Sequence, residues 1–110
     1  FAGRLGIVVG GDYAKPERAE SSAALSTDGG RTWMAVPDPG PGGFRSAVVM
    51  QKGGLYALAI GSHGVSYSRD RGRRWLPLAA GGYHAISITA EGAGWAVGAG
   101  GRIARVVITR

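Results

Sequence analysis

The residues of this chain best suited to chemistry are two aspartates that occupy the same sequence frame. Asp28 and Asp70 each lie in the pattern S-x-D-x-G-x-x-W, which spans residues 26–33 and again residues 68–75. Two carboxylates separated by roughly 5–10 Å can hydrolyse a glycosidic bond. An aspartate in such a glycine-rich frame can instead accept hydrogen bonds from backbone N–H groups and fold a turn. The surrounding residues decide between these two roles.

The other positions of the frame favour the turn. The glycines can adopt a positive φ angle at little steric cost, the serines can bond to the turn backbone, and the tryptophans can cover the hairpin with a large apolar ring. The frame residues are Ser26, Asp28, Gly30, Trp33, Ser68, Asp70, Gly72 and Trp75. We expect structural roles for all eight, with the two aspartates on different hairpins and too far apart to act together.

The elements that carry these turns are short apolar runs separated by glycine. The runs cover residues 5–9, 23–26, 33–36, 44–50, 55–60, 65–68, 75–78, 85–89, 95–97 and 103–108. The chain contains 21 glycines among 110 residues, far above the usual ~7%. No window has the period of a capped amphipathic helix. Short strands with frequent turn signals predict an all-β fold.

The spacing of the two frames predicts a repeat architecture. Ser26 and Ser68 are 42 residues apart, and a period of about 40–45 residues is typical of four-stranded propeller blades. We therefore expect a β-propeller fragment of about two and a half four-stranded blades. It would contain a partial blade at 1–36, a full blade at 44–78 and a partial or closing blade at 83–110. Because a propeller typically has about 4–8 blades, further blades or other copies of the chain are expected to close the ring.

The charge of the chain leaves anionic partners open. It has 13 Lys and Arg against 7 Asp and Glu, a net charge of +6, which suits a polyanion or serves solubility alone. Arginines crowd the second frame beside Trp75 and form a candidate anion-binding cluster. The cluster consists of Arg69, Arg71, Arg73 and Arg74. An acidic glycan, an acidic protein tail or lipid headgroups would suit it.

The remaining reactive side chains predict no cofactor and no metal site. Cysteine is absent, so the chain can form neither a disulfide nor a thiolate site. His63 and His84 lack the spacing of metal ligands, although equivalent blades could bring both to one rim. The glycine-rich residues 98–101 are not followed by the helix that a dinucleotide-binding loop needs. No apolar run reaches the ~18 residues of a membrane-spanning helix.

The repeated frame resembles the Asp-box, also called the bacterial neuraminidase repeat. A second segment, GWAVGAGGRI at residues 94–103, is similar to the G-W-A-V-G-x-x-G-x-I strand pair of photosystem II stability/assembly factor-like propellers. The resemblance covers nearly the whole chain, from Gly6 to about Val107. It implies that Asp28 and Asp70 are structural residues at the periphery of the blades, and that the protein is periplasmic or secreted.

Two functions remain open at this point. In the first, the chain is a non-catalytic propeller scaffold that binds another, unidentified protein, as an assembly or stability factor would, with a polar surface loop inserted at residues 12–22. In the second, it is a sialidase-like glycoside hydrolase whose active residues lie partly outside this segment. A sialidase places an arginine cluster and a Tyr–Glu pair on its central face. Those residue types occur here without a recognisable catalytic motif, at Arg4, Arg45, Arg102, Arg105, Tyr13, Tyr56, Tyr67, Tyr83, Glu17, Glu20 and Glu91. We expect the first function, with no catalytic residue in this chain.

Overall fold

A computed structural model of the chain describes residues 2–10, 23–37, 40–79, 81–89 and 91–108. These residues form strands in three antiparallel sheets and contain no α-helix. A short 3₁₀ turn, η1 (Ala99–Gly101), connects two strands of the third sheet. Within these ranges no helix is long and apolar enough to cross a membrane. The prediction of an all-β fold is confirmed.

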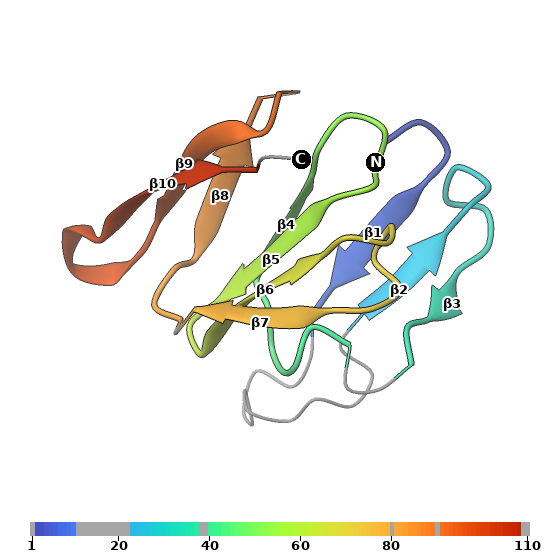
Figure 1. The fold of residues 1–110 in the computed structure, drawn as a ribbon. Helices are drawn as coiled ribbons and strands as arrows, with labels where there is room; N and C mark the ends of the chain where they lie inside the picture. Colours follow the sequence, from blue (N-terminus) through green and yellow to red (C-terminus); the bar gives the residue numbers. More distant parts are fainter. Residues whose placement is uncertain (1, 11–22, 38–39, 80, 90, 109–110) are drawn as a thin grey trace.

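The strands follow chain order within each sheet (Figure 1). The first sheet contains β1 (Gly6–Val9), β2 (Ala23–Ser26) and β3 (Met34–Ala35). The second contains β4 (Ala47–Met50), β5 (Ala57–Gly61), β6 (Gly64–Ser68) and β7 (Leu76–Ala79). The third contains β8 (Ala85–Ile88), β9 (Ala93–Val97) and β10 (Ile103–Val107). Each of the ten predicted runs overlaps one of these strands.

β4 begins later than the run at 44–50 predicted. The backbone N–H of Arg45 donates a hydrogen bond to the carbonyl oxygen of Gly10 at 2.8 Å, which directs this residue toward the end of the first sheet. The Arg45 side chain is buried, and its guanidinium donates to the carbonyl oxygen of Pro41 at 2.8 Å and to Ser66 Oγ at 2.9 Å. These contacts hold the segment outside the β-ladder until β4 starts.

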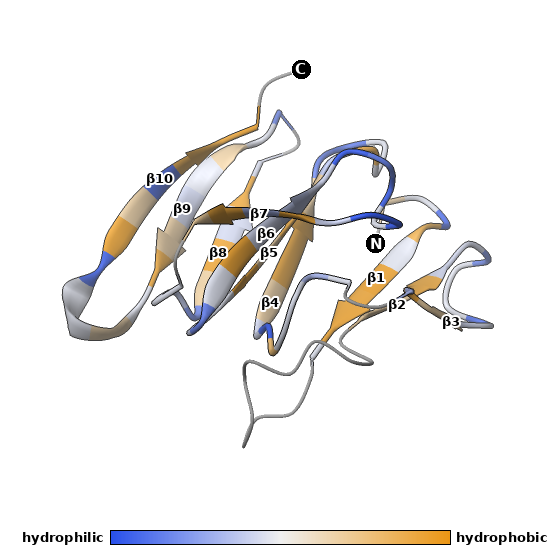
Figure 2. Cartoon of the chain, turned by 60° about the horizontal axis from the view of Figure 1, so that its bottom comes forward, coloured by the Kyte–Doolittle hydropathy of each residue, from blue (hydrophilic) through white to orange (hydrophobic). Residues whose placement is uncertain are grey.

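Two apolar clusters lie on opposite faces of the second sheet, in which Figure 2 shows β4 to be hydrophobic along its length. Successive residues of β5 alternate between the clusters, because side chains of a strand point to opposite faces in turn. The cluster shared with the first sheet contains Ile7, Ala23, Leu25, Val36 and Ala57, with Val9, Val48, Met50 and Trp75 packed against it. The cluster shared with the third sheet contains Leu58, Ile60 and Val65, with Ala47, Val49, Tyr67, Tyr83, Ile86 and Val106 packed against it. The second sheet is therefore covered on both faces.

The three sheets spread outward from their first strands. β4 lies beside both β1 and β8, whereas β3 and β7, the last strands of their sheets, line opposite sides of a groove. The second sheet therefore lies between the first and the third (Figure 1). The described residues supply three successive sheets and no closed ring.

The outer face of the third sheet is apolar and exposed. Trp95 and Ile103 are 58% and 64% exposed, and Val97 and Val107 on the same face are about half exposed. Of the alternate residues of these strands, Ala96 is buried, and Ala104 and Val106 are half-buried. In the alignment of β9 with β5, Trp95 and Val97 occupy the positions of Leu58 and Ile60, which the third sheet covers.

Candidate functional site

The first S-x-D-x-G-x-x-W frame folds into a turn closed by its own side chains. Ser26 Oγ accepts a hydrogen bond from the N–H of Gly30 at 2.9 Å and donates one to Asp28 Oδ1 at 2.8 Å. Asp28 Oδ1 also accepts from the N–H groups of Arg31 and Thr32, both at 3.0 Å. The Thr32 hydroxyl donates to Asp28 Oδ2 at 2.6 Å. This hydroxyl, the Thr32 N–H and the Ser26 hydroxyl lower the pKa of Asp28 to about 2, so its carboxylate is ionised and engaged at neutral pH.

The second frame makes the same set of bonds with one difference. Ser68 Oγ accepts from the N–H of Gly72 at 2.8 Å and donates to Asp70 Oδ1 at 2.9 Å, which in turn accepts from the N–H of Arg74 at 2.8 Å. Arg74 stands where the first turn has Thr32, so the hydroxyl bond is lost. Partial burial raises the pKa of Asp70, but the bonds from Arg74 and Ser68 and the charge of Arg74 outweigh burial and leave the pKa below its ordinary value.

Each turn is tied to the loop that precedes the strand before its own, β1 (Gly6–Val9) for the first turn and β5 (Ala57–Gly61) for the second. The N–H of Gly29 donates to the carbonyl oxygen of Arg4 at 2.9 Å, and the N–H of Arg71 donates to the carbonyl oxygen of Leu55 at 3.0 Å. The two donors are 42 residues apart, as are the two frames. The turns are thus equivalent in their internal bonds and in their attachment.

The second turn also packs against the first sheet. A Cβ atom added to Gly72 would lie 2.8 Å from Ile7 Cδ1 and 2.9 Å from Leu25 Cδ2, so only glycine fits here. In each turn the tryptophan indole N–H donates to the glycine carbonyl, at 2.7 Å from Trp75 to Gly72 and at 3.1 Å in the first turn. Trp75 packs against the cluster between the first two sheets, whereas Trp33 is 40% exposed.

Arginine side chains surround a hollow beside the second turn. Arg4, Arg71 and Arg73 line it together with Thr27, and its volume is about 210 Å³. All its lining residues belong to the described ranges, and none of them is acidic. Arg71 has a φ of +65°, the one positive value at a non-glycine residue in these ranges, and the equivalent Gly29 has a φ of +75°. We call this feature the arginine hollow.

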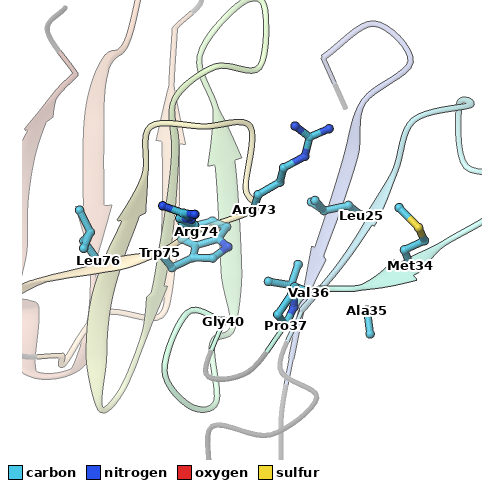
Figure 3. A pocket seen from close by; sticks show the side chains of 10 residues that line it. All are labelled: Leu25, Met34, Ala35, Val36, Pro37, Gly40, Arg73, Arg74, Trp75 and Leu76. Atoms are coloured by element: carbon cyan, nitrogen blue, oxygen red, sulfur yellow. The ribbon is translucent and has the colours of Figure 1, made fainter.

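An apolar groove of about 730 Å³ adjoins the arginine hollow and shares Leu25 and Arg73 with it. The groove lies between β3 and β7 (Figure 3). Its lining residues are Leu25, Met34, Ala35, Val36, Pro37, Gly40, Arg73, Arg74, Trp75 and Leu76. Figure 3 shows the aliphatic side chains of the first sheet facing Trp75 across it, with the arginines on the side of the second sheet. We call this feature the intersheet groove.

The structure does not bring the four arginines of the second frame into one site. Arg71 and Arg73 line the arginine hollow, and Arg73 and Arg74 line the intersheet groove. Arg69 instead lies 5.9 Å from the centre of the Tyr67 ring and lines a different hollow. Arg4 lies in the same hollow as Arg71 and Arg73 because the second turn packs on the first sheet. The sequence shows no sign of this proximity.

The residue types expected of a sialidase are dispersed. Arg45 is buried and burial lowers its pKa, Arg105 lies on the exposed face of the third sheet, and Glu91 is exposed on a turn, where its carbonyl oxygen accepts from Gln51 Nε2 at 3.5 Å. The guanidinium of Arg102 lies 5.7 Å from the centre of the Tyr83 ring. Tyr13, Glu17, Glu20 and the predicted loop at 12–22 lie outside the described residues.

The two histidines are engaged in separate local contacts. His63 Nδ1 is hydrogen-bonded to the hydroxyl of Ser62 at 2.8 Å. His84 donates its N–H to the carbonyl oxygen of Val97 at 2.8 Å, and its own carbonyl accepts from the Ser46 hydroxyl at 3.0 Å. In the part of the chain that the structure describes, no group of three or more His, Asp or Glu side chains could hold a metal ion.

Comparison of the chain with protein-family models, with curated proteins and with solved structures gives no match.

Proposed function

We propose that this chain is part of a non-catalytic β-propeller scaffold of the Asp-box type, and that its function is to bind another protein. The observation that carries the proposal is the pair of matching turns on successive sheets, in which Asp28 and Asp70 accept hydrogen bonds from the turn itself. A carboxylate with a lowered pKa and several such bonds is a poor general acid at neutral pH. Aspartates in this state stabilise a scaffold.

The arrangement of the sheets supports the propeller. Successive sheets pack face to face around neighbouring first strands, and the exposed face that carries Trp95 matches the face of the second sheet that the third sheet covers. In the proposed ring, a further sheet covers Trp95 and Val97. An experimental structure of the full-length protein tests this arrangement, and a Trp95 side chain that faces solvent there would contradict it.

The exposed surface between the first two sheets supports a protein partner. Protein–protein interfaces are enriched in aromatic residues, methionine and arginine, and the intersheet groove combines Trp75, Met34, Arg73 and Arg74. Met34 is 68% exposed, although it extends the apolar wall that Leu25 and Val36 form. Contiguous exposed apolar surface rimmed by polar residues marks interaction sites, and Met34 adds to such a surface beside Arg73 and Arg74.

Affinity purification of the tagged full-length protein from its source cells, followed by quantitative mass spectrometry, tests the proposed function. We expect one protein to be recovered in stoichiometric amount, and Glu91→Gln to leave its recovery unchanged. Parallel assays on sialosides and aryl glycosides test the alternative function, a sialidase-like glycoside hydrolase. Turnover that Glu91→Gln abolishes, with no stoichiometric partner, would overturn the proposal in favour of a sialidase-like hydrolase. A periplasmic or secreted location, proposed from the resemblance alone, is tested by fractionating the same cells.

A further inference from the structure

We propose that the arginine hollow and the intersheet groove together bind an acidic segment of the partner protein, with a carboxylate in the hollow and a neighbouring apolar side chain in the groove. The inference rests on the proposed function and names the chemistry of its partner. The two features are continuous, since Leu25 and Arg73 line both.

The positive charge of the arginine hollow favours an anionic ligand. Arg4 comes from the start of the first sheet, and Arg71 and Arg73 come from the second turn, so three arginines from two sheets line one hollow of about 210 Å³. Guanidinium groups bind carboxylates through paired hydrogen bonds. Thr27 adds a hydroxyl to the same lining. None of the described residues that line the hollow is acidic, and we propose that the partner supplies the carboxylate.

The backbone of Arg71 is the second observation that points to a ligand. The position requires a left-handed conformation, which the first turn fills with Gly29 and which an L-residue adopts only at an energetic cost. Residues held in such conformations concentrate at binding sites. Arg71 lines the hollow, and among the described residues its backbone N–H, bonded to the carbonyl oxygen of Leu55, is the group that ties it to the fold. We infer that the left-handed backbone at Arg71 is kept because it places this arginine at the binding site.

The intersheet groove favours an apolar side chain next to that carboxylate in the partner segment. Its walls are formed by Leu25, Met34, Val36 and Pro37 on one side and by Trp75 on the other. A volume of about 730 Å³ lies within the range of roughly 300–1,000 Å³ that is usual for ligand pockets. Apolar walls of this kind gain free energy by removing aliphatic side chains from water.

A protein segment fits this pair of features better than a glycan or a nucleic acid does. Polyanions bind along tracks of cations, with affinity that rises with the number of contacts to the backbone. Here Arg69 is directed to Tyr67 and a different hollow, and the surface that continues from the arginine hollow is the apolar groove. An acidic peptide with aliphatic side chains matches both its charged and its apolar part.

Fluorescence anisotropy with labelled hexapeptides and the full-length protein tests the inference. The probes are peptides of alternating Glu and Leu, of alternating Glu and Ser, and of alternating Lys and Leu. We expect the Glu–Leu peptide to bind most tightly, the Glu–Ser peptide to bind more weakly, and the Lys–Leu peptide not to bind. A sulfated heparin octasaccharide that binds where the Glu–Leu peptide does not would overturn the inference in favour of a polyanion site.

Variants separate the two parts of the site. Removing one arginine of an exposed ion pair weakens binding by up to roughly five-fold, and we expect a loss of roughly two- to five-fold for Arg71→Gly and for Arg73→Gln. Arg69→Gln removes the same charge outside the site and is expected to change affinity less than two-fold. Met34→Ser should weaken binding of the Glu–Leu peptide and leave binding of the Glu–Ser peptide unchanged. Equal effects of Arg71→Gly and Arg69→Gln would contradict the assignment.

The same variants distinguish failure of this inference from failure of the proposed function. Recovery of a stoichiometric partner that survives both Arg71→Gly and Arg73→Gln overturns the site and leaves the scaffold function standing. Peptide binding with the expected variant pattern, in a protein that recovers no partner, supports the site and overturns the scaffold function. Loss of partner and peptide together in Arg71→Gly, with the protein still folded by circular dichroism, supports both.

Discussion

Arg71 occupies the backbone position that Gly29 occupies in the first turn, and both residues have left-handed φ angles, +65° and +75°. The two turns agree in their hydrogen bonds on either side of this position. Exchanging arginine for glycine at position 71 therefore measures the free-energy cost of a side chain at this left-handed position. It also links the stability of the second turn to the proposed binding of an acidic segment.

Replacing Arg71 with glycine should stabilise the folded protein. The left-handed conformation costs an L-residue about 1–2 kcal/mol, and glycine adds about 0.4–1 kcal/mol of backbone entropy to the unfolded chain, so we expect a net gain of about 0.5–1 kcal/mol. Urea unfolding of the full-length protein measures it. Arg73→Gly removes the same charge and should not stabilise, because no positive φ is recorded at Arg73. An Arg71→Gly protein no more stable than Arg73→Gly would contradict the argument.

The strands of this protein could be predicted from the sequence because they depend on local patterns. Apolar runs bounded by glycine place strands such as β5 and β9 with bounds that differ by a few residues from those observed. The side-chain hydrogen bonds of Ser26 and Asp28 join residues no more than four positions apart, which spacing alone can suggest.

The sites between sheets could not be predicted in the same way. Arg4 and Arg71 are 67 residues apart and meet in one hollow only because the second turn packs on the first sheet. Arg45 looks like a surface arginine in the sequence, but the loop before β4 buries it. The left-handed Arg71 follows from the turn geometry, and its residue type gives no sign of it, since arginine disfavours that conformation.

Gly72 should tolerate a methyl group much less well than Gly29. Both have positive φ angles, +86° and +75°, but a Cβ at Gly29 meets open space, whereas one at Gly72 would lie within 2.9 Å of side-chain atoms of the first sheet. We expect Gly29→Ala to cost about 1 kcal/mol from backbone strain. Gly72→Ala adds an overpacking cost of about 1–3 kcal/mol. Similar unfolding free energies for the two variants would show that the second turn does not press on the first sheet.

Replacing Arg45 with lysine, which keeps the positive charge, should still destabilise the folded protein. Its guanidinium donates to the carbonyl oxygens of Pro41 and Phe44 and to Ser66 Oγ, at 2.8–3.0 Å, from a buried position. An ammonium group cannot reproduce that planar set of donors, so Arg45→Lys should destabilise the protein by about 1–3 kcal/mol through unsatisfied buried acceptors. Arg105→Lys, on an exposed face, is the matched control and should change stability by less than about 0.5 kcal/mol. Equal effects in thermal unfolding would contradict the buried role of Arg45.

The first turn should lose stability in acid because Asp28 holds its charge to a lower pH in the folded state than in the unfolded state. Its pKa is lowered from 3.8 to about 2, first by the Thr32 hydroxyl. Above about pH 5 both states are ionised and the contribution of Asp28 is complete. As the pH falls from about 5 to about 2, the unfolded state takes up the proton first, so that contribution is progressively lost. Thr32→Val removes the strongest bond and should move the pKa of Asp28 back toward its ordinary value, which carboxyl NMR shifts measure directly. Thr27→Val removes a hydroxyl that is not bonded to Asp28 and should leave the titration in place. An Asp28 that titrates alike in both variants would mean that Thr32 does not hold the carboxylate.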